Sequence, residues 1–130
     1  MLFRSLGFLR SFVRRRANGL RTELRINALV QELIDRRFVT PGGMSIAHVF
    51  DTGAKDDARY GIDLRLVCIG ERRFFVPLQV KSRDKDQHEH QKKYVAIPSI
   101  VVRWNEDNES ISKKLATLID AYAAGTVAHV

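Results

Sequence analysis

The spacing of apolar residues predicts an amphipathic helix over residues 20–37. Apolar side chains recur there every three or four residues, which is the period of one helical face: Ile26, Leu29, Val30, Leu33 and Ile34. At 100° per residue, Glu23 falls close to Val30 and Glu32 falls on the opposite side. We therefore expect the Glu23 carboxylate to point inward. The Pro41-Gly42-Gly43 segment should end the helical region.

Alternation of apolar and polar residues predicts one strand over residues 44–50 and a hairpin over residues 62–82, with a loop between them. The hairpin strands meet at Gly70-Glu71, a pair typical of a type II′ turn. Its even-numbered residues form an apolar face. The opposite face should carry four polar side chains at the open end of the hairpin: Asp63, Arg65, Gln79 and Lys81.

The pattern of polar and apolar residues in the remaining third of the chain predicts two helices and a strand. Residues 83–93 are polar and fit a short helix or loop, whereas residues 94–104 are a long apolar run typical of a buried strand. A final amphipathic helix should begin at Asn108 or Ser110 and end near Tyr122. The order α-β-β-β-α-β-α predicts an α/β fold in which helices flank a mixed four-stranded sheet.

Length and charge refine this picture. The 130 residues suit one compact domain, and we place a basic amphipathic extension at residues 1–18 before an α/β domain at 19–130. The net charge is +7, and residues 1–37 carry nine arginines against three acidic residues. Such a basic segment attracts phosphate backbones, so DNA is the expected partner. The candidate nucleic-acid contacts are Arg14, Arg15, Arg16 and Arg21.

Residues 1–16 also suit two other roles. Their Phe and Leu residues alternate with arginines, as in a transit peptide or a helix on a membrane surface. We favour packing of this helix on its own domain or on a partner, and a homodimer stays open. The single cysteine, Cys68, cannot form an internal disulfide and favours a reducing compartment, so the expected location is cytoplasmic.

The hairpin brings together residue types that suit a divalent ion. The start of its first strand lies beside the end of its second, so Asp63 should sit near Gln79 and Lys81, and Glu23 can approach from the helix. Carboxylate and amide oxygens are ligands for Mg²⁺ or Mn²⁺. Lys81 would add a fixed positive charge near a scissile phosphate. We expect these four groups to converge at one end of the sheet.

At these residues the chain resembles the PD-(D/E)xK nuclease superfamily, in which a hairpin carries an Asp and then a (D/E)-x-K tripeptide. Asp63 matches the motif Asp, Lys81 the motif Lys, and Glu23 the helical Glu of resolvase-like members. Gln79 stands where the family usually has an acid, although Mrr-type endonucleases are similar in using Gln-x-Lys. Ile62 stands where the motif has Pro.

The resemblance implies a restriction-endonuclease-like α-β-β-β-α-β core and a Mg²⁺- or Mn²⁺-dependent DNA endonuclease. Its implied catalytic residues are Glu23, Asp63, Gln79 and Lys81, and the first three are its implied metal ligands. The main alternative is a nuclease-like module that binds nucleic acid without cutting it, which the neutral Gln79 favours.

Three further features of the sequence bear on this site. The acidic residues Asp51, Asp56 and Asp57 could replace or support Asp63. The His88-Glu89-His90 segment is a poor zinc motif, because residues two apart do not share a helical face. The aromatic residues Tyr60, Tyr94 and Trp104 are too scattered along the chain to predict a base-stacking platform.

Overall fold

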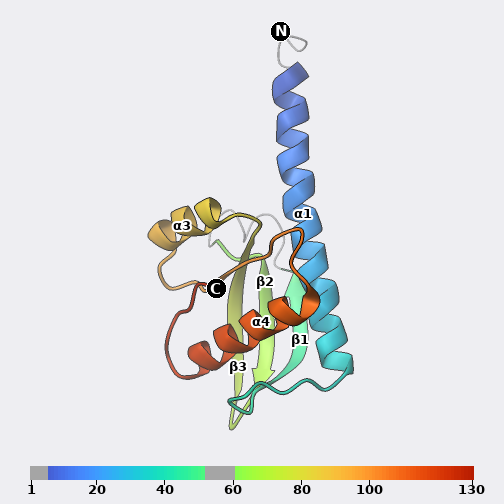
Figure 1. Cartoon of the computed structure of the whole chain (residues 1–130). Helices are drawn as coiled ribbons and strands as arrows, with labels where there is room; N and C mark the ends of the chain where they lie inside the picture. The colour runs from blue at the N-terminus through green and yellow to red at the C-terminus, as the bar shows by residue number, and fades with distance from the viewer. Residues whose placement is uncertain (1–5, 52–60) are drawn as a thin grey trace.

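The protein folds as an α/β domain built on one mixed sheet (Figure 1). The structure, a computed structural model, describes residues 6–51 and 61–130, with side chains described from Arg21 onward. The elements in chain order are α1 (Leu6–Asp35), β1 (Ser45–Asp51), β2 (Leu64–Ile69), β3 (Arg73–Lys81), α3 (Asp84–Lys93), β4 (Ser99–Val101) and α4 (Asn108–Ala123). The sequence prediction of an α/β fold with a four-stranded mixed sheet is confirmed.

The four strands lie in the order β1-β2-β3-β4. The first three form an antiparallel meander, in which Asp51 pairs with Leu64 and Leu64 pairs with Leu78. The fourth strand is parallel to β3 and pairs Ser99 with Gln79. A parallel neighbour requires a crossover, and α3 provides it between the two strands.

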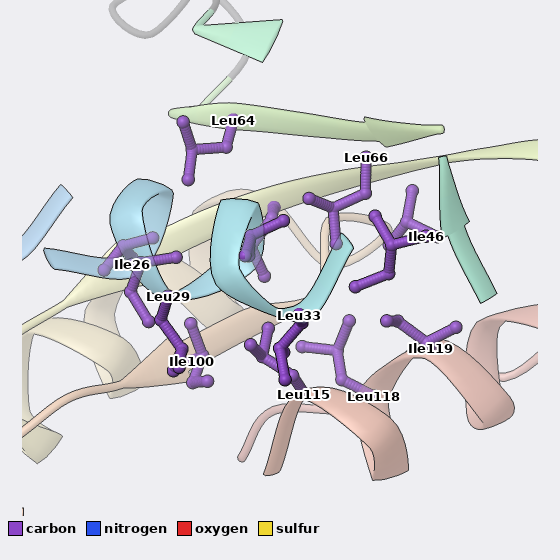
Figure 2. Packing of buried hydrophobic residues seen from close by; sticks show 14 of the residues in the cluster. Ile26, Leu29, Leu33, Ile46, Leu64, Leu66, Ile100, Leu115, Leu118 and Ile119 are labelled. Atoms are coloured by element: carbon purple, nitrogen blue, oxygen red, sulfur yellow. The ribbon is translucent and has the colours of Figure 1, made fainter. Parts of the chain in front are cut away.

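Helices α1 and α4 cover the same face of the sheet, where their apolar side chains meet those of the strands (Figure 2). The helices contribute Ile26, Leu29, Leu33, Leu115, Leu118 and Ile119, all of them buried. Each such side chain contributes roughly 1.5–3 kcal/mol when it leaves water. The lone Cys68 belongs to this core, where burial raises its pKa to about 12 and keeps the thiol protonated.

Helix α1 is longer than the helix that the sequence pattern predicted. It runs without interruption from Leu6, so it crosses the expected boundary between the extension and the domain. Its N-terminal half projects beyond the rest of the molecule, and its C-terminal half packs on β1 and β3 (Figure 1). In the described parts of the chain, no helix combines the length and apolar character needed to cross a membrane.

Two sequence predictions about the strands are wrong in detail. Ile69 pairs with Arg73, which leaves three residues in the hairpin loop, and Gly70 lacks the positive φ that a type II′ turn requires at its first position. The strand expected over residues 94–104 spans only Ser99–Val101. Residues 94–97 form a turn before Pro98, and Trp104 lies in a second turn, so only the middle of the apolar run is a strand.

Candidate functional site

Asp63 directly precedes β2, and its side chain takes part in the hydrogen bonding between this end of β2 and β3. Its carboxylate is buried, and its Oδ2 accepts a hydrogen bond of 2.8 Å from the backbone N–H of Val80. The backbone N–H of Asp63 donates to the carbonyl of Leu78 at 2.9 Å. The carboxylate therefore occupies the place of a strand carbonyl beside β3. Because a carboxylate has about four lone-pair positions, this bond does not prevent metal coordination.

Gln79 lies in the last part of β3, one residue from the N–H that Asp63 binds. Its backbone is paired with β4, since its N–H donates to the carbonyl of Pro98 at 3.0 Å. The side chain is only 4% exposed, and among the described residues none donates a hydrogen bond to its Oε1. A buried oxygen without a donor costs about 1–3 kcal/mol. An unpaired acceptor in this position is suited to a cation.

Lys81 ends β3 and is half-buried. It follows Gln79 by two residues, so both side chains leave the same face of the strand, opposite the face that α1 and α4 cover. Its charge also acts on α3. The pKa of Asp86 is lowered first by a hydrogen bond from Arg83, at 2.9 Å, and further by the charge of Lys81. Lys81 is thus one of several cations around the end of β3.

Glu23 lies on the part of α1 that passes the same end of the sheet. Its side chain is half-buried. Neighbouring residues of that helical turn, Arg21 and Arg25, line a surface pocket of about 590 Å³ together with Ser82 and Arg83, which directly follow Lys81. The structure therefore brings this turn of α1 beside the end of β3. However, α1 covers the face of the sheet opposite the side chains of Gln79 and Lys81, so convergence of Glu23 with them on one ion stays a prediction.

Some candidate residues lie elsewhere or outside the described residues. Asp51 is exposed and ends β1 opposite Leu64, one residue from Asp63, so it stays a candidate supporting acid. Asp56 and Asp57 fall within residues 52–60, which the structure does not describe. The side chains of Arg14, Arg15 and Arg16 are likewise outside the described part, although their backbone belongs to α1.

The available donors limit the kind of metal site. Within residues 21–51 and 61–130, no group of three or more His, Cys, Asp or Glu side chains could hold a metal ion. His90 is buried on α3, where its Nε2 lies 3.3 Å from the carbonyl of Ile97, whereas His88 is exposed. A zinc site is therefore not supported. A site at the end of β3 needs the Gln79 amide oxygen and oxygens from a substrate.

Of the residues that line the surface pocket, the sequence pattern indicated Arg21 but missed two further arginines and the tryptophan. Arg25, Arg83 and Trp104 line it together with Arg21. Arg25 was detectable, because it follows Arg21 by one helical turn. The apolar run extends to Trp104 and so predicts a buried strand there, yet the Asn-Glu-Asp-Asn sequence that follows it indicates a turn.

Comparison with family models, curated proteins and solved structures finds no match to this chain.

Proposed function

We propose that this protein is a metal-dependent DNA nuclease of the PD-(D/E)xK type, with a restriction-endonuclease-like core. One observation carries the proposal: the buried Gln79 Oε1 has no donor among the described residues, while Asp63 is bonded to the adjacent residue and Lys81 follows two residues later. A purely structural glutamine in this position would be expected to have a partner. An oxygen kept unpaired at an energetic cost is typical of a functional site.

The order and direction of the elements support the same proposal. The chain has a helix, an antiparallel meander of three strands, a crossover helix and a strand parallel to the third, and the nuclease resemblance implies the same order of elements. In this core the Asp and the x-Lys pair lie on adjacent strands. Here those strands are β2 and β3, and the hydrogen bond from Val80 to Asp63 joins them at that end.

The residues at the end of β3 fit a hard divalent ion such as Mg²⁺ or Mn²⁺. Asp63 and Gln79 would hold it. Glu23 lies on α1, which covers the face of the sheet opposite the Gln79 side chain, so this further acidic ligand would have to reach the ion around the end of β3. When bound, such an ion polarises a phosphodiester and lowers the pKa of a bound water. Lys81 stabilises negative charge on the phosphate during hydrolysis. Two carboxylates and a neutral amide bind cations weakly, so DNA phosphate oxygens complete the site.

The basic helix supports DNA as the substrate. Arg21 lines the pocket next to Ser82 and Arg83, and α1 continues from Arg21 away from the sheet at this end of the molecule (Figure 1). The arginines at 14–16 lie on that continuation. DNA that enters the candidate site would therefore pass along the basic part of α1.

Neutralising those arginines should weaken DNA binding through lost phosphate contacts. In the triple variant Arg14→Gln, Arg15→Gln, Arg16→Gln, the plot of log affinity against log salt should flatten by about 0.9 for each contact removed. Fluorescence anisotropy at several salt concentrations measures this slope. The matched control is Arg72→Gln with Arg73→Gln, which removes exposed charge at the other end of the sheet. A triple variant with unchanged affinity and slope would assign the segment to targeting or membrane contact.

A nuclease-like module that binds DNA without cutting is the second candidate. Two observations favour it: residue 79 carries no charge, and the described residues hold no cluster of three or more acidic, histidine or cysteine ligands. Lower charge at the site weakens metal affinity. The two candidates differ in one measurable property, which is phosphodiester hydrolysis.

Cleavage of supercoiled and branched DNA with Mg²⁺ or Mn²⁺, compared with an EDTA control, tests the proposal. We expect nicked or linear products only with the metal. DNA binding without metal-dependent products on either substrate would support the non-catalytic module. In that case, cleavage restored by Gln79→Glu would identify the missing carboxylate as the reason.

A further inference from the structure

Trp104 is the most exposed of the large apolar side chains in the described part of the chain. It is 92% exposed and lies in the turn between β4 and α4. Single exposed apolar residues are common, but a fully exposed tryptophan contributes nothing to a core and favours association with other molecules. The proposed chemistry at the end of β3 leaves this residue without a role.

The turn that carries Trp104 is held rigidly. The backbone N–H of Glu106 donates to the carbonyl of Arg103 at 3.0 Å, which closes the turn around Trp104. The Arg25 guanidinium donates to the same carbonyl at 3.1 Å and also to the carbonyl of Glu106, so the turn is fixed to α1. The Glu106 carboxylate is bound in turn by Lys114 at 2.8 Å. The indole is therefore presented from a preorganised support.

The surroundings of Trp104 combine an aromatic ring with positive charge. Arg21, Arg25 and Arg83 line the same pocket, as does Ser82, which follows Lys81 in the sequence. Arg25 is bonded to backbone carbonyls, which leave its charge unneutralised. Arg83 is paired with Asp86 but keeps a largely exposed side chain. Aromatic rings that stack on bases, next to arginines that contact phosphates, are the chemistry of single-strand recognition.

We propose that the pocket around Trp104 binds an unpaired nucleotide of the DNA, with the base stacked on the indole and its phosphates beside the arginines. This inference rests on the proposed function and specifies its substrate class. Bases in a continuous duplex are already stacked on one another and cannot cover the indole. The substrate is therefore DNA with unpaired bases close to the scissile phosphate, such as a flap, a junction or a single strand.

The lone tryptophan allows a direct test, since the chain has no other. The full-length protein is titrated in EDTA with a single-stranded oligonucleotide and, separately, with the matching duplex. We expect the single strand to quench the Trp104 fluorescence and the duplex to leave it nearly unchanged. In anisotropy titrations, Trp104→Ala should weaken single-strand binding about tenfold and duplex binding less than about twofold.

The matched control is Phe75→Ala, which removes an aromatic side chain that is 59% exposed on β3. It should leave both affinities unchanged. Equal quenching by duplex and single strand, or no quenching by either, would overturn the proposal. A blue shift with anionic vesicles but no quenching by DNA would also overturn it, because the tryptophan would then contact membranes.

The two proposals fail in different ways, because the EDTA titration requires no catalysis. Metal-dependent cleavage without single-strand quenching would contradict the Trp104 subsite and leave the nuclease standing. Quenching without cleavage on any DNA would support the subsite and contradict the nuclease.

Discussion

Asp63→Asn is expected to abolish most metal-dependent cleavage while the protein stays folded and binds DNA. The asparagine amide oxygen can still accept the hydrogen bond from the N–H of Val80, so the buried contact between β2 and β3 survives. The negative charge that would attract the cation is lost. Changing residues that only support metal ligands already lowers metal affinity or activity about 10–100-fold. For a direct ligand we therefore expect the cleavage rate to fall by more than about a hundredfold.

Two companion variants separate chemistry from folding. Asp63→Ala removes the acceptor as well, leaves the N–H of Val80 unsatisfied and should cost about 1–3 kcal/mol of stability. The control Asp120→Asn changes a half-buried carboxylate that accepts from Thr40 and Gly42 near the opposite end of the sheet. It should affect thermal stability but not cleavage. Wild-type cleavage rates in Asp63→Asn would remove Asp63 from the site.

Lys81→Ala should lower the turnover number far more than DNA affinity. Removing one preorganised group that stabilises transition-state charge costs about 10²–10³ in rate. Its loss from a protein with 22 Lys and Arg residues should change the DNA dissociation constant by no more than about threefold. Single-turnover cleavage and anisotropy on the same DNA measure the two quantities.

Lys85→Ala is the matched control for Lys81. Both lysines lower the pKa of Asp86, so a merely structural role would make the two variants behave alike. Lys85 is exposed on α3, outside the candidate site, and its loss should leave turnover unchanged. Equal turnover in both variants would assign Lys81 to the support of α3.

Periodicity predicted the core because apolar patterning reports which side of an element is buried. The helical stripe from Ile26 to Leu33 and the alternation through β2 and β3 reappear as one cluster on one face of the sheet. The order of the strands and the crossover followed from the same pattern. Glu23, which helix phase predicts to point inward, has a half-buried side chain.

Pattern alone could not predict where the backbone turns. Pro98 and the turn at residues 94–97 shorten β4, although the apolar run suggested a continuous strand. The turn at Trp104 depends on Arg25, which is far away along the chain but donates to its carbonyls. Such long-range bonds leave no local signal. The hairpin pattern predicts that Asp63 lies near Gln79 and Lys81, but it does not predict the hydrogen bond from the backbone N–H of Val80 to the Asp63 carboxylate.

Mn²⁺ binding in the presence of DNA tests most directly whether Asp63 and Gln79 hold a divalent ion. Electron paramagnetic resonance of free Mn²⁺ gives the bound fraction for wild type, Gln79→Glu and Gln79→Met with a phosphorothioate DNA that resists cleavage. We expect DNA to tighten Mn²⁺ binding by the wild type, Gln79→Glu to tighten it further and Gln79→Met to weaken it about tenfold. Gln79→Met should also raise thermal stability, because it removes a buried oxygen without a donor among the described residues. Equal Mn²⁺ binding by wild type and Gln79→Met, or no binding by the wild type with DNA present, would contradict the proposed site.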